Sequence, residues 1–175
     1  TPNGYKAGEL YAVIPVPTLG AEEVTDGDFP TGSTAWGLES NASIGNNELT
    51  LNGSSINVYA EQTLYSAGLY DGKTLQFTYE IISNNLVGSG DFRGGDLSGG
   101  SLFPSATNLS SDVGIHTINI VIDSSGNNSA LDLYITGLYT SGSLVIDNVS
   151  VKEYTSADMD VTRATDATRV NESGL

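Results

Sequence analysis

One aspartate stands out because an apolar strand surrounds it. In the stretch 144–151, Leu144 and Ile146 fall on one face, and Val149 and Val151 alternate again after a single slip at Asp147 and Asn148. A one-residue slip in a period-two pattern predicts a β-bulge, which turns side chains to the other face. A carboxylate at such a bend needs a partner, which is a backbone N–H group, a cationic side chain or a metal ion. We expect this late strand to pair with the start of the domain.

Aromatic residues beside turns are the second set of candidates. Binding sites for sugars combine apolar and aromatic surfaces with a few placed polar groups. Tyr65 and Tyr70 flank a short Ala-Gly pair, so we expect both to be exposed. Phe92 and Arg93 follow Asp91 in a Gly-rich loop, where they would form an aromatic and polar lip around a ligand.

The sequence offers little to a catalytic mechanism. His116 is the one histidine and lies within a strand pattern, so no Ser-His-Asp triad is expected. Cysteine is absent, which excludes a thiol nucleophile and a thiolate zinc site. No pair of carboxylates stands in a recognisable glycosidase setting. We therefore predict that the chain is not an enzyme.

The charge balance narrows the class of partner. The chain has 21 acidic and 6 basic residues in 175, for a formal net charge of -15. Nucleic acid and anionic membrane surfaces both require a basic face, so neither is expected as a partner. No apolar run is long enough to cross a membrane, and no membrane insertion is predicted. An acidic surface remains compatible with divalent cations and with neutral sugars.

Short alternating strands separated by turns dominate the middle of the chain. Residues 74–82 alternate most clearly, and residues 115–122 and 131–135 follow the same pattern. An Asn-Gly turn at residues 52–53 predicts a hairpin between residues 48–51 and 56–60. Turns every ~8–12 residues predict an all-β fold, a jelly-roll β-sandwich of two antiparallel sheets with short extended terminal segments.

Three regions follow from this pattern. Residues 1–23 form a leader segment and linker, and the polar stretch 18–28 continues as a linker into the domain. Residues 24–155 form the jelly-roll domain. Residues 156–175 form a polar C-terminal segment that is too short to fold alone, and we expect it to pack on a neighbour or another chain.

Three motifs in the middle region resemble the jelly-roll carbohydrate-binding modules of the galactose-binding-like superfold. They are Thr25-Asp26-Gly27-Asp28-Phe29 with Trp36 shortly after, Tyr59-Ala60-Glu61-Gln62-Thr63, and Ile146-Asp147-Asn148-Val149-Ser150-Val151. The resemblance implies that the first motif pairs with the last, and that the domain binds glycans without catalysis. Trp36 is one candidate ligand-binding aromatic, although its position in such modules is usually in the core, which favours burial.

The same resemblance implies a structural Ca2+ ion. In related modules the aspartate that matches Asp147 helps to hold this ion near the start of the domain. Asp26 and Asp28 would add carboxylate oxygens, and backbone carbonyls would complete the shell of ~6–8 oxygens that calcium prefers. The family commonly has Glu after the Phe, whereas this chain has Pro30. The alternative is that Asp147 caps the bend through backbone N–H groups.

The two ends of the chain resemble a different class of protein. Residues 4–15 and 160–175 look like neighbouring pieces of one segment found in bacteriophage tail-fibre and other virion proteins, with the jelly roll inserted between them. This resemblance implies a virion structural protein, a fibre or surface decoration on the particle surface. It would assemble with other virion proteins as a homo-oligomer, a trimer if it is a fibre.

Two functions remain open on these grounds, while a third reading, a non-catalytic module of a bacterial polysaccharidase, leaves the two ends of the chain unexplained. In the first, the jelly roll binds host-surface glycans and serves adhesion of the particle. In the second, the protein is a purely structural capsid decoration or fibre module with no ligand.

Overall fold

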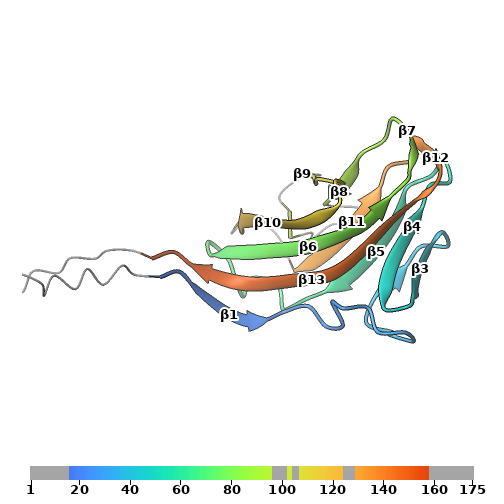
Figure 1. The fold of residues 1–175 in the computed structure, drawn as a ribbon. Helices are drawn as coiled ribbons and strands as arrows, with labels where there is room; N and C mark the ends of the chain where they lie inside the picture. Colours follow the sequence, from blue (N-terminus) through green and yellow to red (C-terminus); the bar gives the residue numbers. More distant parts are fainter. Residues whose placement is uncertain (1–15, 96–101, 104–106, 124–128, 158–175) are drawn as a thin grey trace, which may run out of the picture. The chain divides into compact units, whose positions relative to one another are not determined.

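The computed structural model describes residues 16–95, 102–103, 107–123 and 129–157 (Figure 1). Leu19–Thr155 form one compact unit. The two phage-like segments, 4–15 and 160–175, lie outside the described residues. Within the described ranges, no helix has the length and apolar character needed to cross a membrane.

Two antiparallel sheets form a sandwich, which confirms the predicted all-β jelly roll. The larger sheet, here sheet A, has the order β10-β6-β13-β4-β3, and β1 pairs with β13. Sheet B has the order β2-β5-β11-β8-β9, and β7 pairs with β12 in a separate ribbon. Sheet A contains β1 (Thr18–Glu22), β3 (Ala42–Gly45), β4 (Glu48–Asn52), β6 (Thr74–Asn84), β10 (Gly114–Val121) and β13 (Ser143–Thr155). Sheet B contains β2 (Gly37–Leu38), β5 (Val58–Thr63), β8 (Phe92–Gly94), β9 (Thr107–Asn108) and β11 (Ala130–Ile135), and the ribbon contains β7 (Val87–Gly88) and β12 (Tyr139–Ser141).

The core between the sheets contains a chain of aromatic contacts. Phe77 and Tyr79 of β6 stack with ring centroids 5.0 Å apart. Phe103 meets Phe77 edge-on at 5.6 Å, and Phe92 of sheet B meets Tyr79 edge-on at 5.8 Å. All four rings are buried, and such rings supply much of the apolar area removed from water on folding. The alternation in residues 74–82 therefore correctly identifies the inner face of β6.

The predicted bulge is present in β13. The register with β6 shifts between Asp147 and Ser150, and Asn148 adopts a φ of 52°. The extra residue allows Ile146 and Val149 both to face the core, at 0% and 4% exposure. A period-two strand without this slip would place one of them in solvent.

The same strand joins the end of the domain to its beginning, as predicted. Glu23 donates its backbone N–H to Val151 O at 2.9 Å, and Val149 donates to Gly27 O at 2.8 Å. Beyond the bulge, β13 leaves β4 and pairs with β1. Figure 1 shows β1 running beside β13.

Two details of the sequence prediction are wrong. Residues 48–51 and 56–60 do not form a hairpin, because β4 belongs to sheet A and β5 to sheet B. Instead, β4 makes a hairpin with β3 through Asn46 and Asn47, whose φ values of 56° and 62° suit a two-residue turn. Residues 18–28 are not all linker either, since Thr18–Glu22 form β1.

Candidate functional site

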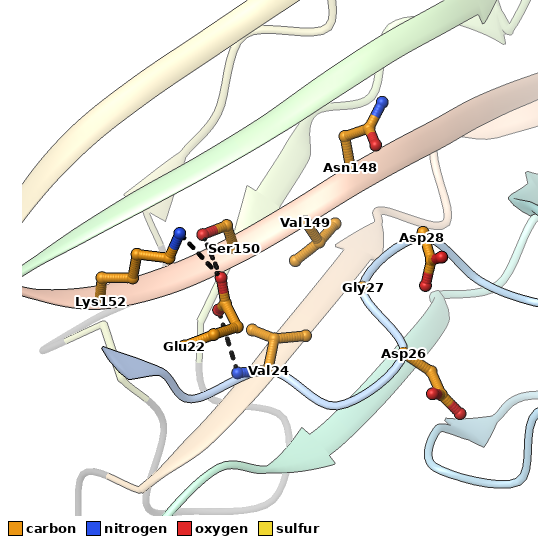
Figure 2. A pocket seen from close by; sticks show the side chains of 9 residues that line it. All are labelled: Glu22, Val24, Asp26, Gly27, Asp28, Asn148, Val149, Ser150 and Lys152. Atoms are coloured by element: carbon orange, nitrogen blue, oxygen red, sulfur yellow. Dashed lines mark hydrogen bonds and ion pairs between the residues drawn. The ribbon is translucent and has the colours of Figure 1, made fainter. Parts of the chain in front are cut away.

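A polar cleft of about 420 Å³ opens where β13 bends (Figure 2). The end of β1, the loop at residues 24–28 and the outer side chains of β13 surround it. It is lined by Glu22, Val24, Asp26, Gly27, Asp28, Asn148, Val149, Ser150 and Lys152.

Glu22 occupies the β1 side of this cleft with its carboxylate fully engaged. Its Oε1 accepts the backbone N–H groups of Val24 at 3.2 Å and Val151 at 2.8 Å. Its Oε2 accepts the Ser150 hydroxyl at 2.6 Å and lies 3.5 Å from Lys152 Nζ. Figure 2 shows the contacts of Glu22 with Val24, Ser150 and Lys152. Glu22 therefore fastens the first strand to the last, and its lone pairs are committed to that task.

The three aspartates predicted to hold calcium do not come together. Asp26 and Asp28 line the cleft, whereas Asp147 does not. Asp26 Oδ2 accepts the Ser33 hydroxyl at 2.7 Å, and Asp147 Oδ1 accepts the backbone N–H of Asn148 at 2.7 Å. In the part of the chain that the structure describes, no group of three or more His, Cys, Asp or Glu side chains could hold a metal ion. The residues present thus do not fit a three-carboxylate calcium site. Asp147 instead accepts a backbone N–H at the bend, which is the contact that the alternative to calcium predicts.

Trp36 lies in the core, as the family position favours, and so cannot offer its ring to a ligand. It is 5% exposed, and its indole Nε1 donates to Asp26 O at 3.1 Å. Its ring lies 5.1 Å from that of Phe29, which is fully buried. Trp36 therefore fixes the shape of the opening loop.

The expectation that Tyr65 and Tyr70 are both exposed is wrong. Tyr65 is only 9% exposed and meets the Tyr70 ring edge-on at 4.7 Å. Tyr70 is half-buried, donates its hydroxyl to the Glu23 carboxylate and has Lys73 Nζ over its ring at 5.3 Å. Burial raises the pKa of Tyr65, and the hydrogen bond to Glu23 raises the pKa of Tyr70 to about 12. Because Lys73 covers a face of Tyr70, this pair serves packing better than ligand stacking.

Phe92 and Arg93 separate to opposite faces of β8. Phe92 is 2% exposed and packs in the core, so the predicted aromatic lip is wrong at this residue. Arg93 points outward, where Arg93 Nη2 lies 2.6 Å from Asp91 Oδ2. Side chains in a strand alternate between faces, so two neighbours cannot both line one binding surface.

Arg93 instead belongs to a row of side chains that crosses the outer face of sheet B. In the strand registers, Arg93 lies opposite Asn108 on one side and Tyr134 on the other, and Tyr134 lies opposite Tyr59. The neighbouring residues Leu133 and Ala60 are fully buried in the core, which places the row on the other face. We call Asn108, Arg93, Tyr134 and Tyr59 the cross-strand row.

Hydrogen bonds hold the arginine of this row in place. Hydrogen bonds to the Asp91 carboxylate and then to the Tyr134 hydroxyl raise the pKa of the Arg93 guanidinium. Tyr134 is 4% exposed, while Tyr59 is half-buried and keeps part of its surface in solvent. A planar cation and an adjacent ring are thus fixed side by side.

Carboxylates form the neighbouring row on the same face. Asp132 lies directly opposite Glu61, and Glu61 lies opposite Gly37. A Cβ on Gly37 would stand 3.1 Å from Glu61 Cγ, so the glutamate side chain rests over the glycine. Two like charges opposite each other are unfavourable for the sheet. Asp132 is fully buried, so Glu61 and Asp91 are the carboxylates that this face offers a ligand, beside a guanidinium and an aromatic surface.

Of the predicted ligand-binding residues, the structure therefore places only Arg93 on this face. Tyr134 was missed as a site residue, although the sequence carries a signal for it and for Tyr59, which lies in the second of the three motifs. Each stands between inward-facing apolar residues in an alternating strand, so each faces outward. The signal becomes specific only when the pairing of β5, β11 and β8 is known.

The known proteins to which the chain is similar are solved structures. No family model and no curated protein matches the chain. Among solved structures, the enzymatically active domain of tailspike protein 4 of bacteriophage CBA120 has a TM-score of 0.53 and 12% identity, covering 75% of this chain and 21% of that one. An arabinose-bound α-L-arabinofuranosidase, MgGH51, has a TM-score of 0.47 and 14% identity, covering 77% and 27%. The mannan-recognising carbohydrate-binding module TmCBM27 has a TM-score of 0.42 and 16% identity, covering 80% and 98%.

At these identities the likeness concerns the fold alone. The chain spans only 21% and 27% of the length of the first two chains.

Proposed function

We propose that the jelly-roll domain is a non-catalytic glycan-binding module, and that the outer face of sheet B is its binding surface. The observation that carries this proposal is the cross-strand row of Asn108, Arg93, Tyr134 and Tyr59. Neighbouring strands are ~4.8 Å apart, so a row across four strands is roughly 14 Å long. That length suits an extended oligosaccharide better than a single small molecule.

The chemistry of the row suits hydroxyl-rich ligands. The exposed part of Tyr59 supplies an apolar surface against which the C–H face of a sugar ring packs. Arg93 and Asn108 donate hydrogen bonds to sugar oxygens, and Asp91 and Glu61 accept them from hydroxyls. Because Asp91 already holds Arg93, little side-chain entropy is lost when a ligand binds.

The charge of the face favours neutral glycans over acidic ones. Arg93 is neutralised by Asp91, while Glu61 adds negative charge beside the row. The whole chain carries a formal charge of -15, so an acidic polysaccharide would be repelled as it approached.

The second part of the proposal is that a bacteriophage virion carries this module and uses it to adhere to host-surface glycans. The support is the resemblance of residues 4–15 and 160–175 to phage virion proteins. Adjacent first and last strands, β1 and β13, suit a domain inserted between two such segments. A fold shared with a phage tailspike domain supports the setting by analogy only. Many copies on one particle would turn weak single sites into strong attachment.

The test is binding of the full chain to a panel of immobilised neutral and acidic oligosaccharides. We expect binding to a neutral class, and a loss of roughly tenfold or more in Tyr59→Ala. Tyr154→Ala is the matched control, because Tyr154 is also a partly exposed strand tyrosine but belongs to sheet A. Binding that Tyr59→Ala and Tyr154→Ala weaken equally would refute the proposed surface. A folded chain that binds no glycan would favour the purely structural decoration or fibre module.

A further inference from the structure

Within the described ranges, strand β10 forms one edge of sheet A and carries none of the usual protection of an edge. Its one neighbour in the described sheet is β6. Natural proteins guard such edges with lysine, proline, bulges or covering segments, because an open edge pairs with other strands. The sequence from Gly114 to Val121 contains no lysine, arginine or proline, and its register with β6 runs without a shift. The edge is therefore long, regular and competent to pair.

The hydrogen-bond pattern shows which backbone groups this edge presents. Ile122 donates its N–H to Lys73 O at 2.9 Å, which sets the alternation of the β10–β6 ladder. By this alternation, even-numbered residues of β10 bond to β6, and odd-numbered residues point their N–H and C=O groups away. The outward-pointing residues are Ile115, Thr117, Asn119 and Val121. In the described ranges, none of these four has a backbone hydrogen bond to a further segment.

The side chains of the same residues place two exposed aliphatic groups at the ends of the strand. Ile115 is 71% exposed and Val121 is 65% exposed. Between them, the polar residues Thr117 and Asn119 contact the β6 side chains Thr78 and Gln76, at 3.3 Å in each case. The order of side chains along the outer face is thus aliphatic, polar, polar, aliphatic.

Charge also sets this edge apart from the rest of the chain. Residues 113–122 contain no aspartate or glutamate, in a chain that carries 21 acidic residues. Two copies of a strongly acidic protein repel each other, so they approach most easily through a stretch that lacks carboxylates. Asp112 and Asp123 mark the two ends of this neutral stretch.

We propose that β10 pairs antiparallel with β10 of a second copy of this chain, about a twofold axis at Ile118. In this register Ile115 faces Val121 of the second copy, and Thr117 faces its Asn119. All of these are outward-pointing residues, so each exchanges both of its backbone hydrogen bonds across the axis. Any register with outward-pointing residues opposite each other satisfies the backbone, but this one also pairs the exposed aliphatic side chains.

The twofold register also places no two like charges directly opposite each other. Asp123 of one copy falls opposite Val113 of the other, and no aspartate faces an aspartate. An isologous contact of this kind closes on itself, so it produces a dimer and not a fibre. The partner is therefore a second copy of this chain and not an unrelated strand, because the pattern of side chains is its own complement.

Sedimentation of the full chain over a wide range of concentrations tests the proposal. We expect a dimer that strengthens as salt is added, since salt screens the repulsion between two acidic copies. Thr117→Pro should yield a monomer, because proline removes an outward N–H yet is tolerated on an edge strand when that N–H does not serve the sheet. Thr117→Ala is the matched control, which loses the same side chain but keeps the N–H and should remain dimeric. A native thermal transition in Thr117→Pro shows that the sheet itself is intact.

A charge exchange tests the register independently. Ile115→Asp alone and Val121→Lys alone should each weaken the dimer, and Ile115→Asp with Val121→Lys should restore it through two symmetric ion pairs. A monomer at every concentration and salt would overturn the proposal. So would an oligomer that survives Thr117→Pro unchanged, or a double variant that is no more dimeric than either single variant.

Discussion

Gln62 ties three parts of the chain together, and its replacement should destabilise the domain without touching the proposed binding face. It is 6% exposed at the inner side of β5. Its Oε1 accepts the N–H of Thr25 at 2.8 Å, and its Nε2 donates to Thr25 O at 2.8 Å and to Ala35 O at 3.2 Å. The amide therefore holds the opening loop and the Trp36 segment against sheet B.

The size of the effect follows from these three bonds. Gln62→Met keeps the volume but removes all three, at a net cost of about 1 kcal/mol each. The free energy of unfolding should fall by about 3 kcal/mol, and the thermal midpoint by roughly 6–12 °C at the ~2–4 °C per kcal/mol typical of a domain near this size.

Gln62→Glu distinguishes the two bonds that the Gln62 side chain donates from the one that it accepts. A carboxylate still accepts from Thr25 N but repels the carbonyls of Thr25 and Ala35, so its pKa in the folded state should be raised above the unfolded value. The penalty is then full above the folded pKa, and it shrinks as pH falls through that pKa, because a protonated carboxyl donates one bond again. Thermal unfolding of wild type and variant at several pH values measures this difference.

Gln76→Glu is the matched control for this pair. Gln76 lies on the outer face of β6, and its Nε2 donates to Asn119 Oδ1 at 3.3 Å. We expect Gln76→Glu to change the free energy of unfolding by no more than about 0.5 kcal/mol, and the difference between this variant and wild type should not shrink at low pH. If Gln62→Met cost no more than the Gln76 control, the role assigned to the buried amide would be refuted.

Three further predictions concern stability. Gly27→Ala places a Cβ 1.9 Å from Val149 O and should lower the free energy of unfolding, measured in urea, by roughly 2–3 kcal/mol. In the control Gly45→Ala, the new Cβ meets nothing within 4 Å, so equal losses in the two variants would contradict the close backbone approach at Gly27. The pKa of Tyr70 is raised to about 12 and that of Tyr65 is raised by burial. As pH rises, both tyrosines therefore lose their protons in the unfolded chain before they do so in the folded chain. The free energy of unfolding should therefore fall as pH rises above about 10, and Tyr65→Phe should lessen that fall. A Tyr65→Phe variant that loses stability as steeply as wild type above about pH 10 would contradict this prediction. A chelator should shift the thermal midpoint by less than about 1 °C, since the predicted aspartates do not converge; a larger drop that calcium reverses would restore the calcium prediction.

The sequence predicts the layers of this fold well, because burial on one face of a strand imposes a period of two. The inner faces of β6 and β10 and the bulge in β13 follow directly from that period. The hairpin between residues 48–51 and 56–60 fails for a different reason. A turn signal shows that the chain bends, but it does not show whether the next strand stays in the same sheet.

The candidate site is harder to predict, because it depends on pairing between distant strands. Phe92 and Tyr65 are hydrophobic enough to enter the core, and nothing local distinguishes them from exposed aromatic residues. Tyr59, Tyr134 and Arg93 come together only through the registers of β5, β11 and β8. Such registers are set by the packing of the whole sandwich, which no short motif encodes.

The glycan-binding claim depends on the cross-strand row, and one measurement tests it most directly. That measurement is the affinity of wild type, Tyr59→Ala and Tyr154→Ala for the neutral oligosaccharide that the wild-type chain binds best. The proposal predicts a loss of roughly tenfold or more for Tyr59→Ala and no loss for Tyr154→Ala, with all three proteins equally stable to heat. Affinity that Tyr59→Ala leaves unchanged would show that the glycan binds elsewhere, and a folded wild-type chain without affinity for any glycan would contradict the function itself.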